Sequence, residues 1–143
     1  MARYELWTHG VDVVVEFPGV PAEVRRAGWG TLVKQAQNTV NWFHFALPSA
    51  SVIDSSDAFI RAVRLRADVN ENARVDILHF RADGKSPILA RAVSFTDRTI
   101  DETFQTADTP FTGGLVLSVH VSFLTGQPVG AVTFRSAGVV VLN

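Results

Sequence analysis

Apolar and polar residues alternate along several short stretches of the chain, and this period of two residues predicts β-strands with one buried face. The clearest stretch is 115–123 (LVLSVHVSF), where five apolar residues alternate with four residues that would face the other way. Residues 59–69 alternate in the same manner from Val63 onward, although Ile60 and Ala62 break the pattern at its start. The alternation therefore predicts a protein built from strands.

The segment 41–47 (NWFHFAL) is the densest aromatic run in the chain. Aromatic residues favour strands, so successive side chains should point to opposite faces of a sheet. The apolar residues at alternate positions from Phe43 then share one face, which we interpret as core, while Trp42 and His44 share the other. The pattern leaves open whether this second face is packed inside the protein, shared with another subunit or open to a ligand.

Further strand candidates are separated by Gly, Pro, Asn and Asp, which are typical turn residues. They are residues 11–17, 74–80, 88–95, 129–135 and 139–142. Eight or nine short strands with turns between them are typical of a β-sandwich or barrel. The sequence predicts one helix at most, over 21–27 (PAEVRRA), which opens with Pro and ends before a glycine. We therefore predict an all-β fold, a single antiparallel β-sandwich of jelly-roll type.

Length and composition narrow the class of protein further. A chain of 143 residues is expected to form one domain over residues 1–143. Its 13 basic and 14 acidic residues give a net charge of −1, which argues against a nucleic-acid partner because such a partner requires a basic surface. The chain has no cysteine, so disulfides and thiolate sites are excluded.

The sequence contains no segment typical of export or membrane insertion. The first ten residues (MARYELWTHG) lack the apolar core of a secretory signal. No apolar run reaches the roughly 18 residues of a membrane-spanning helix. We therefore expect a soluble protein made in the cytoplasm, without a membrane partner. Export by a leaderless route, or a signal removed before this sequence begins, stays open.

Four segments of the chain stand out together: 7–10 (WTHG), 25–31 (RRAGWGT), 41–48 (NWFHFALP) and 132–138 (VTFRSAG). In this order and spacing they resemble an uncharacterised family of small bacterial all-β proteins. The segment 113–123 is also similar to a core strand of that family. The resemblance extends over nearly the whole chain, with a looser match over 49–109. It implies one compact β-sandwich, and it implies no function and no catalytic residues.

The pattern Trp-x-His occurs twice, at 7–9 and at 42–44, and each time it places an indole and an imidazole on one face of an extended segment. An aromatic ring beside hydrogen-bonding groups is what a sugar site requires, since the ring stacks on the pyranose and the polar groups bind its hydroxyls. Packing of the tryptophans at the ends of the sandwich, or in a subunit interface, explains the same pattern. We predict a lectin-like carbohydrate site made of Trp42, His44, Trp7, His9, Trp29 and Asn41.

The sequence predicts no metal and no cofactor. None of the four histidines stands at the spacing of a zinc ligand pair, and His120 lies between two serines on what we interpret as a solvated face. We interpret His79 as a half-buried strand histidine. Residues 68–72 (DVNEN) begin like a calcium loop, but the chain then departs from the EF-hand pattern, and a hairpin turn explains them. Calcium binding in an irregular loop at 68–72 or 54–57 stays open.

Catalytic motifs are missing from the sequence. It contains no G-x-S-x-G, no H-E-x-x-H and no phosphate-binding loop. Asp12 and Glu16 share a face of a predicted strand, but they are spaced like ordinary solvent-side residues. We therefore expect a non-enzymatic protein.

Self-association is the alternative to a ligand site. Residues 139–142 (VVVL) are apolar on both faces, so this strand must be covered on both sides or pair with another chain. A net charge near zero does little to oppose association. We therefore expect a homo-oligomer. Two hypotheses follow, which can coexist: a carbohydrate-binding module, and a self-associating structural protein with no small-molecule ligand.

Overall fold

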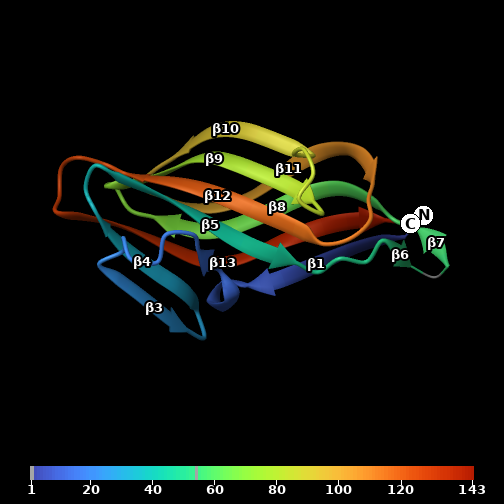
Figure 1. The fold of residues 1–143 in the computed structure, drawn as a ribbon, viewed down its shortest axis with the longest axis horizontal. Helices are drawn as coiled ribbons and strands as arrows, with labels where there is room; N and C mark the ends of the chain where they lie inside the picture. The colour runs from blue at the N-terminus through green and yellow to red at the C-terminus, as the bar shows by residue number, and fades with distance from the viewer. Residues whose placement is uncertain (1, 54) are drawn as a thin grey trace.

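Two antiparallel sheets stacked face to face form the protein (Figure 1). The structure is a computed structural model, and it describes residues 2–53 and 55–143. Its principal strands are β4 (Gly30–Ala36), β5 (Thr39–Leu47), β8 (Phe59–Val69), β9 (Ala73–Ala82), β10 (Leu89–Phe95), β11 (Arg98–Pro110), β12 (Leu115–Phe123) and β13 (Val129–Leu142). Sheet I contains β4-β13-β8-β11 and sheet II contains β5-β12-β9-β10, in these spatial orders. This alternation of strands between two sheets is the jelly-roll order, so the predicted fold class is confirmed.

Shorter elements extend both sheets. β1 (Arg3–His9) pairs with the C-terminal half of β13, and β3 (Glu23–Ala27) pairs with β4, so both belong to sheet I. β2 (Val14–Val15) pairs with β5 at the edge of sheet II. β6 (Val52–Ile53) and β7 (Ser56–Asp57) form a small ribbon close to both chain ends (Figure 1). A 3-10 turn, η1 (Gly10–Asp12), follows β1.

The core lies between the two sheets and is rich in phenylalanine. Phe43 and Phe45 of β5 are fully buried, and their rings lie 4.8 and 5.7 Å from the ring of Phe134 on β13, measured between centroids. The prediction that alternate residues from Phe43 form the core face of 41–47 is therefore confirmed. Trp42 and His44 lie on the opposite, outer face of sheet II.

A β-bulge explains why the alternation in 59–69 fails at its start. Val140 lies opposite Ala62 and Val141 lies opposite Ile60, so β8 carries one extra residue, Arg61, at this point. A bulge shifts the phase of a strand, because two residues then oppose one on the partner. Ile60 and Val63 therefore both point into the core, although residues three positions apart on a regular strand would point to opposite faces.

The helix predicted over 21–27 is wrong, since this segment contains β3. A seven-residue segment is too short to nucleate a stable helix without tertiary support, whereas pairing with β4 satisfies the backbone of β3. Arg26 fixes this hairpin, because its Nη1 donates to the Val11 carbonyl oxygen at 2.6 Å. At the turn, Gly30 has a φ of +135°, and a Cβ there would lie 2.1 Å from the Phe134 carbonyl oxygen. Only glycine fits at that position.

The C-terminal residues form one long strand inside sheet I, where the sequence predicts two strands joined by a turn. β13 continues through the predicted turn by means of a bulge at Arg135. It pairs with β8 on one side and with β4 and then β1 on the other. Residues 139–142 are buried within one chain, so they give no reason to expect pairing with a second chain. The sequence analysis also missed β4 and β11.

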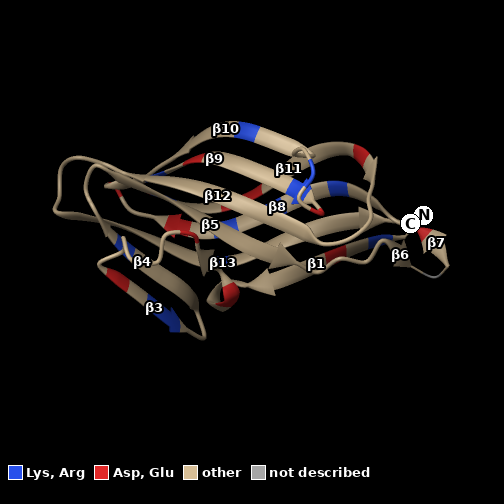
Figure 2. Cartoon of the chain, viewed as in Figure 1, with Lys and Arg blue, Asp and Glu red and all other residues tan. Residues whose placement is uncertain are grey.

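Acidic and basic residues interleave over the fold, as β3 shows with Glu23 beside two arginines (Figure 2). Several of them form ion pairs on the outer face of sheet I, among them Arg64 with Asp101 at 3.4 Å. None of the described residues belongs to a helix that is long and apolar enough to cross a membrane.

Candidate functional site

Strand pairing brings Trp42 together with two histidines that are far away in the sequence. Trp42 of β5 lies opposite His120 of β12. His79 belongs to the next strand, β9, and lies opposite Ser118 of β12 on the same face. The centroid of the indole is 4.8 Å from that of the His120 ring and 5.2 Å from that of the His79 ring. We call the outer side chains of sheet II around this cluster the Trp42 face: Trp42, His44, Asp76, His79, Arg81, Ser118, His120 and Ser122.

A second bulge aims Asp76 onto the Trp42 face. His120 lies opposite Ile77 and Val121 lies opposite Val75, so Asp76 is the extra residue of β9. The Nδ1–H group of His120 donates to Oδ1 of Asp76 at 2.6 Å, and the hydroxyl of Ser122 donates to Oδ2 at 2.5 Å. Only 18% of the Asp76 side chain and 15% of the His120 side chain are exposed. Both oxygens of this carboxylate are therefore engaged, and they fix the orientation of the imidazole.

His44 is held in the same manner by residues on both sides. Its Nε2 lies 3.0 Å from Oε1 of Glu16, and its Nδ1 lies 2.7 Å from the hydroxyl oxygen of Ser118. A carboxylate can only accept, so Nε2 carries the proton and Nδ1 of the neutral ring accepts from Ser118.

This acid–histidine–serine order also occurs in serine hydrolases, but other features of the site do not suit that chemistry. Ser118 is 7% exposed. It lies on a strand that is paired on both sides, so the backbone N–H groups of that strand are directed at neighbouring strands rather than at a reacting oxyanion. The arrangement suits the positioning of side chains better than nucleophilic attack.

His79 and Trp42 both carry open hydrogen-bonding groups on the Trp42 face. Burial, the positive charge of Arg81 and the proximity of His120 lower the pKa of His79 below 6.5, so this imidazole is neutral at pH 7. Neither its ring nitrogens nor the indole Nε1 forms a hydrogen bond to another described residue. Among the described residues, Nε of Arg64 is the only side-chain nitrogen or oxygen atom that is buried and has no hydrogen-bond partner. The ring nitrogens of His79 and the indole Nε1 of Trp42 are therefore accessible to solvent. They remain available to a ligand.

Trp7 lies on the other side of the molecule from Trp42. Its ring lies close to Gly138 on sheet I, where a Cβ at position 138 would be 2.8 Å from ring atom Cε3. The guanidinium carbons of Arg64 and Arg66 lie 4.9 and 4.3 Å from the ring centroid. Trp7 therefore packs among cations and is not brought to the Trp42 face.

His9 and Trp29 lie near the β3–β4 hairpin, also away from Trp42. The Nε2–H group of His9 donates to the Gly28 carbonyl oxygen at 2.8 Å, and Nδ1 accepts from the Val11 N–H at 2.9 Å. Both ring nitrogens of His9 are thus used to hold η1 against the hairpin. Trp29 stands in the hairpin turn with 41% of its surface exposed, and the Arg25 guanidinium carbon lies 5.9 Å from its ring centroid.

Asn41 is fully buried and its side chain is used internally. Its amide nitrogen donates to the backbone carbonyl oxygen of Phe17 at 3.1 Å and to the side-chain Oε1 of Gln35 at 3.0 Å. Its Oδ1 accepts from the backbone N–H groups of Phe17 and Trp42. Of the six predicted site residues, Trp42 and His44 are the two that lie on the Trp42 face.

The sequence analysis missed His79, Asp76, Arg81 and Glu16 as members of a common site. The outward alternation of His120 with Ser118 and Ser122 was visible in the sequence, but the pairing of β12 between β5 and β9 was not. The bulge at Asp76 removes the regular period that would have placed His79 on the outer face.

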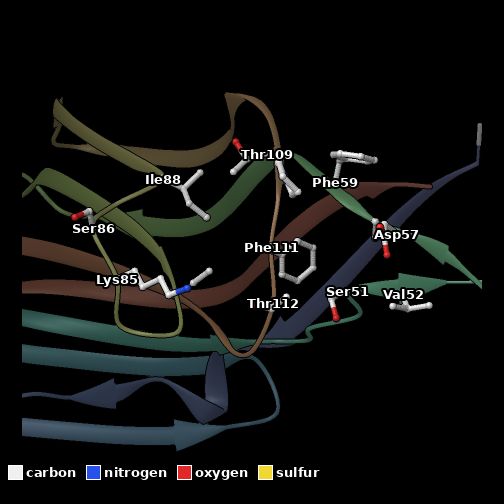
Figure 3. A pocket seen from close by; sticks show the side chains of 13 residues that line it. Ser51, Val52, Asp57, Phe59, Lys85, Ser86, Ile88, Thr109, Phe111 and Thr112 are labelled. Carbon is white, nitrogen blue, oxygen red and sulfur yellow. The ribbon is translucent and has the colours of Figure 1, made fainter.

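A pocket of about 420 Å³ opens at the end of the sandwich near the β6–β7 ribbon (Figure 3). Phe111, Ala58 and Ile88 form an apolar floor, while Lys85 and Asp57 lie at its rim. None of its lining residues belongs to the Trp42 face.

Metal ligands do not gather in the described part of the chain, where no three His, Asp or Glu side chains are placed to hold an ion. Within 68–72, Oδ1 of Asn70 accepts from the N–H groups of Asn72 and Ala131, as expected for a turn. The 54–57 loop includes Asp54, which lies outside the described residues.

Solved structures share this fold at low sequence identity. The xylan-binding module CBM15 matches with a TM-score of 0.54 and 12% identity, over 99% of this chain and 97% of that module. A carbohydrate-binding module of family 29 matches with a TM-score of 0.52 and 12% identity, over 97% and 90% of the two chains. A family two carbohydrate esterase from Cellvibrio japonicus matches with a TM-score of 0.52 and 10% identity, over 97% of this chain. This chain spans only 34% of that esterase.

No curated protein matches the chain. Residues 1–129 match the model of a family of unknown function, DUF6623, in agreement with the resemblance of the four sequence segments to an uncharacterised all-β family. The chain therefore belongs to this family of unknown function.

Proposed function

We propose that this protein binds carbohydrate on the Trp42 face and catalyses no reaction. One observation supports this function above all: an indole with an open N–H group lies beside two imidazoles on the outer side of a β-sheet, 4.8 and 5.2 Å away between ring centroids. The apolar face of a pyranose ring stacks on an indole, and imidazole nitrogens bind the hydroxyls at its edge.

The face around Trp42 leaves room for a ligand. On β10, the residues opposite His79 and Ile77 are Ala90 and Ala92, and both are exposed. On β5, the residue after His44 on the same face is Ala46, which is exposed as well. His79 therefore has a small neighbour on β10, and the face is also low beyond His44, which leaves space for a saccharide at this end of the sheet.

The polar groups of the Trp42 face are oriented before any ligand binds. Asp76 holds His120, while Glu16 and Ser118 hold His44. Side chains that are already fixed lose less conformational entropy on binding, so weak individual contacts to hydroxyls can add up to a useful affinity. The likeness to carbohydrate-binding modules supports the same proposal through the fold.

The experiment is calorimetric titration of the protein with a panel of neutral and acidic oligosaccharides, together with two tryptophan variants. We expect Trp42→Ala to weaken binding by about tenfold or more, which corresponds to about 1.4 kcal/mol. Trp29→Ala is the matched control, because it removes an indole that is remote from the Trp42 face, and it should leave the affinity unchanged. Equal affinity of the Trp42 variant and the wild type would contradict the proposal, as would the absence of any saccharide binding at millimolar concentration.

Residues 139–142 are buried within the chain and no longer support self-association. Of the two subunit contacts that the sequence predicts, the outward face of Trp42 and His44 remains. Sedimentation velocity over a dilution series addresses this alternative. A monomer at every concentration is expected, and an oligomer that Trp42→Ala dissociates would assign the face to a subunit interface instead.

A further inference from the structure

We propose that the preferred ligand is an acidic oligosaccharide, and that Arg81 binds the carboxylate of one of its uronate residues. This inference rests on the proposed carbohydrate-binding function and specifies the chemical class of the ligand.

Arg81 lies on the Trp42 face next to the aromatic cluster. It follows His79 by two residues on β9, so both side chains leave the same side of the sheet, about 7 Å apart along the strand. Arg81 lies opposite Val116 of β12, which in turn lies opposite Ala46 of β5. The side chains opposite Arg81 in this row are therefore small and apolar, and the guanidinium of Arg81 is its only polar group.

Arg81 has no acidic partner among the described residues, unlike most arginines that lie on the faces of the two sheets. Arg74, at the other end of the Trp42 face, has its Nη2 atom 3.9 Å from Oδ2 of Asp76. On sheet I, Arg66 and Arg64 both pair with Asp101. The positive charge of Arg81 acts instead on the ring of His79, whose pKa it helps to lower.

A guanidinium without an anion is suited to a carboxylate. Its planar fork forms two parallel hydrogen bonds to the two oxygens of such a group, and the geometry discriminates against hydroxyls. A sugar stacked on Trp42 and bonded to His79 would continue along β9 toward Arg81. The next residue of the same saccharide would then bring a carboxylate to the guanidinium.

The two carboxylates that contact histidines of the Trp42 face favour the same orientation of the ligand. Glu16 lies beside His44 at the β2 edge of sheet II, on the opposite side of the face from β9. Asp76 is engaged by His120 and Ser122 at the end of the face away from Arg81. A uronate placed near either carboxylate would be repelled, so the end of the face at Arg81 is the favourable place for negative charge.

The test compares tetragalacturonate and tetramannuronate with their carboxyl-reduced, neutral counterparts, by calorimetric titration of the wild type and Arg81→Met. We expect at least one uronate to bind about tenfold tighter than its reduced form. Arg81→Met should abolish this difference by weakening the binding of the uronate far more than that of the reduced form. The preference should also weaken as salt is added, because the contact is electrostatic.

Two further variants make the result specific. Arg91→Met is the matched control, because Arg91 is on the neighbouring strand, lacks an ion pair among the described residues and stacks on Phe104, with 5.7 Å from its guanidinium carbon to the ring centroid. It should keep the preference for uronates. Arg81→Lys keeps the charge without the fork and should give an intermediate preference.

The outcomes separate this inference from the function on which it rests. Equal affinity for uronates and reduced sugars, both lost in Trp42→Ala, would overturn the role of Arg81 and leave the carbohydrate site standing. A uronate preference that persists in Arg81→Met would also overturn it. If neither the uronates nor any neutral oligosaccharide binds, the proposed function falls, and this inference falls with it.

Discussion

Asp76 and His120 are joined by a hydrogen bond of 2.6 Å across two strands whose register changes at that point. The contact exists because a bulge gives β9 one residue more than β12, and the additional residue is the aspartate. Bulges often aim a side chain at a functional site, since they break the strict alternation of a strand. The carboxylate so placed fixes the imidazole that borders Trp42.

Removal of the Asp76 carboxylate should destabilise the fold. In Asp76→Ala, the partly buried His120 and Ser122 lose their common acceptor, and we expect the free energy of unfolding to fall by about 1–3 kcal/mol. Urea denaturation followed by circular dichroism measures this change. Glu71→Gln in the exposed β8–β9 turn is the control and should stay within about 0.5 kcal/mol of the wild type. Equal stability of the two variants would show that the network has no energetic importance.

The three tryptophans should differ in their access to solvent. In single-tryptophan variants, acrylamide should quench the fluorescence of Trp29 most, because Trp29 is the most exposed of the three. Trp42 should be quenched less, to the same extent at every protein concentration, and a bound saccharide should protect Trp42 alone. Quenching of Trp42 that increases on dilution would indicate a subunit contact on this face.

Gly138 should be essential for the packing of Trp7. A methyl group at this position would lie 2.8 Å from the ring, closer than van der Waals contact allows, so Trp7 would have to move from its place beside Arg64 and Arg66. We expect Gly138→Ala to lower the free energy of unfolding by about 1–3 kcal/mol. Gly19→Ala is the control, since nothing lies within 4 Å of a Cβ at that exposed position. Thermal melting compares the two, and a Gly138 variant as stable as the control would contradict the packing described.

His79 should contribute to the loss of stability in mild acid. Its pKa in the folded protein is lowered from 6.5, mainly by burial, so the unfolded chain binds a proton more readily than the folded one. Stability is therefore lost as the pH falls below 6.5 through the folded pKa, and His79 has no such effect above 6.5. His79→Gln cannot take up this proton and should lose less stability between pH 7.5 and pH 5 than the wild type does. Parallel denaturant titrations at both values measure the difference, and identical losses would refute it.

The alternation of apolar and polar residues correctly predicts which side chains are buried wherever a strand is regular and has one face on the core. It places Phe43 inward and Trp42 outward correctly, and the same alternation places Asn41 inward, which the inclusion of Asn41 in a ligand site overlooked. It fails where a bulge changes the period, at Arg61 and at Asp76. It also fails for β3, which has few apolar residues and owes its extended form to β4.

The candidate site depends on information that the sequence does not contain. Trp42, His79 and His120 belong to three strands, and their proximity follows from the order β5-β12-β9. Asn41 and Trp42 are neighbours on one strand, so their side chains point to opposite faces of sheet II. Trp7 and Trp42 lie on strands of different sheets, because β1 pairs with β13 in sheet I while β5 belongs to sheet II. Two tryptophans that follow the same Trp-x-His pattern thus end on opposite sides of the molecule.

The interior position of β13 determines the order in which the two sheets can form as the chain is synthesised. Sheet II is complete once β12 has left the ribosome, because all of its strands precede β13. In sheet I, the β8–β11 pair has no bonds to β4 or β1 except through β13. Until residues 129–142 emerge, a nascent chain can hold sheet II with its phenylalanine-rich inner side only partly covered. Exposed apolar surface of this kind promotes aggregation, so the risk is greatest before β13 is available.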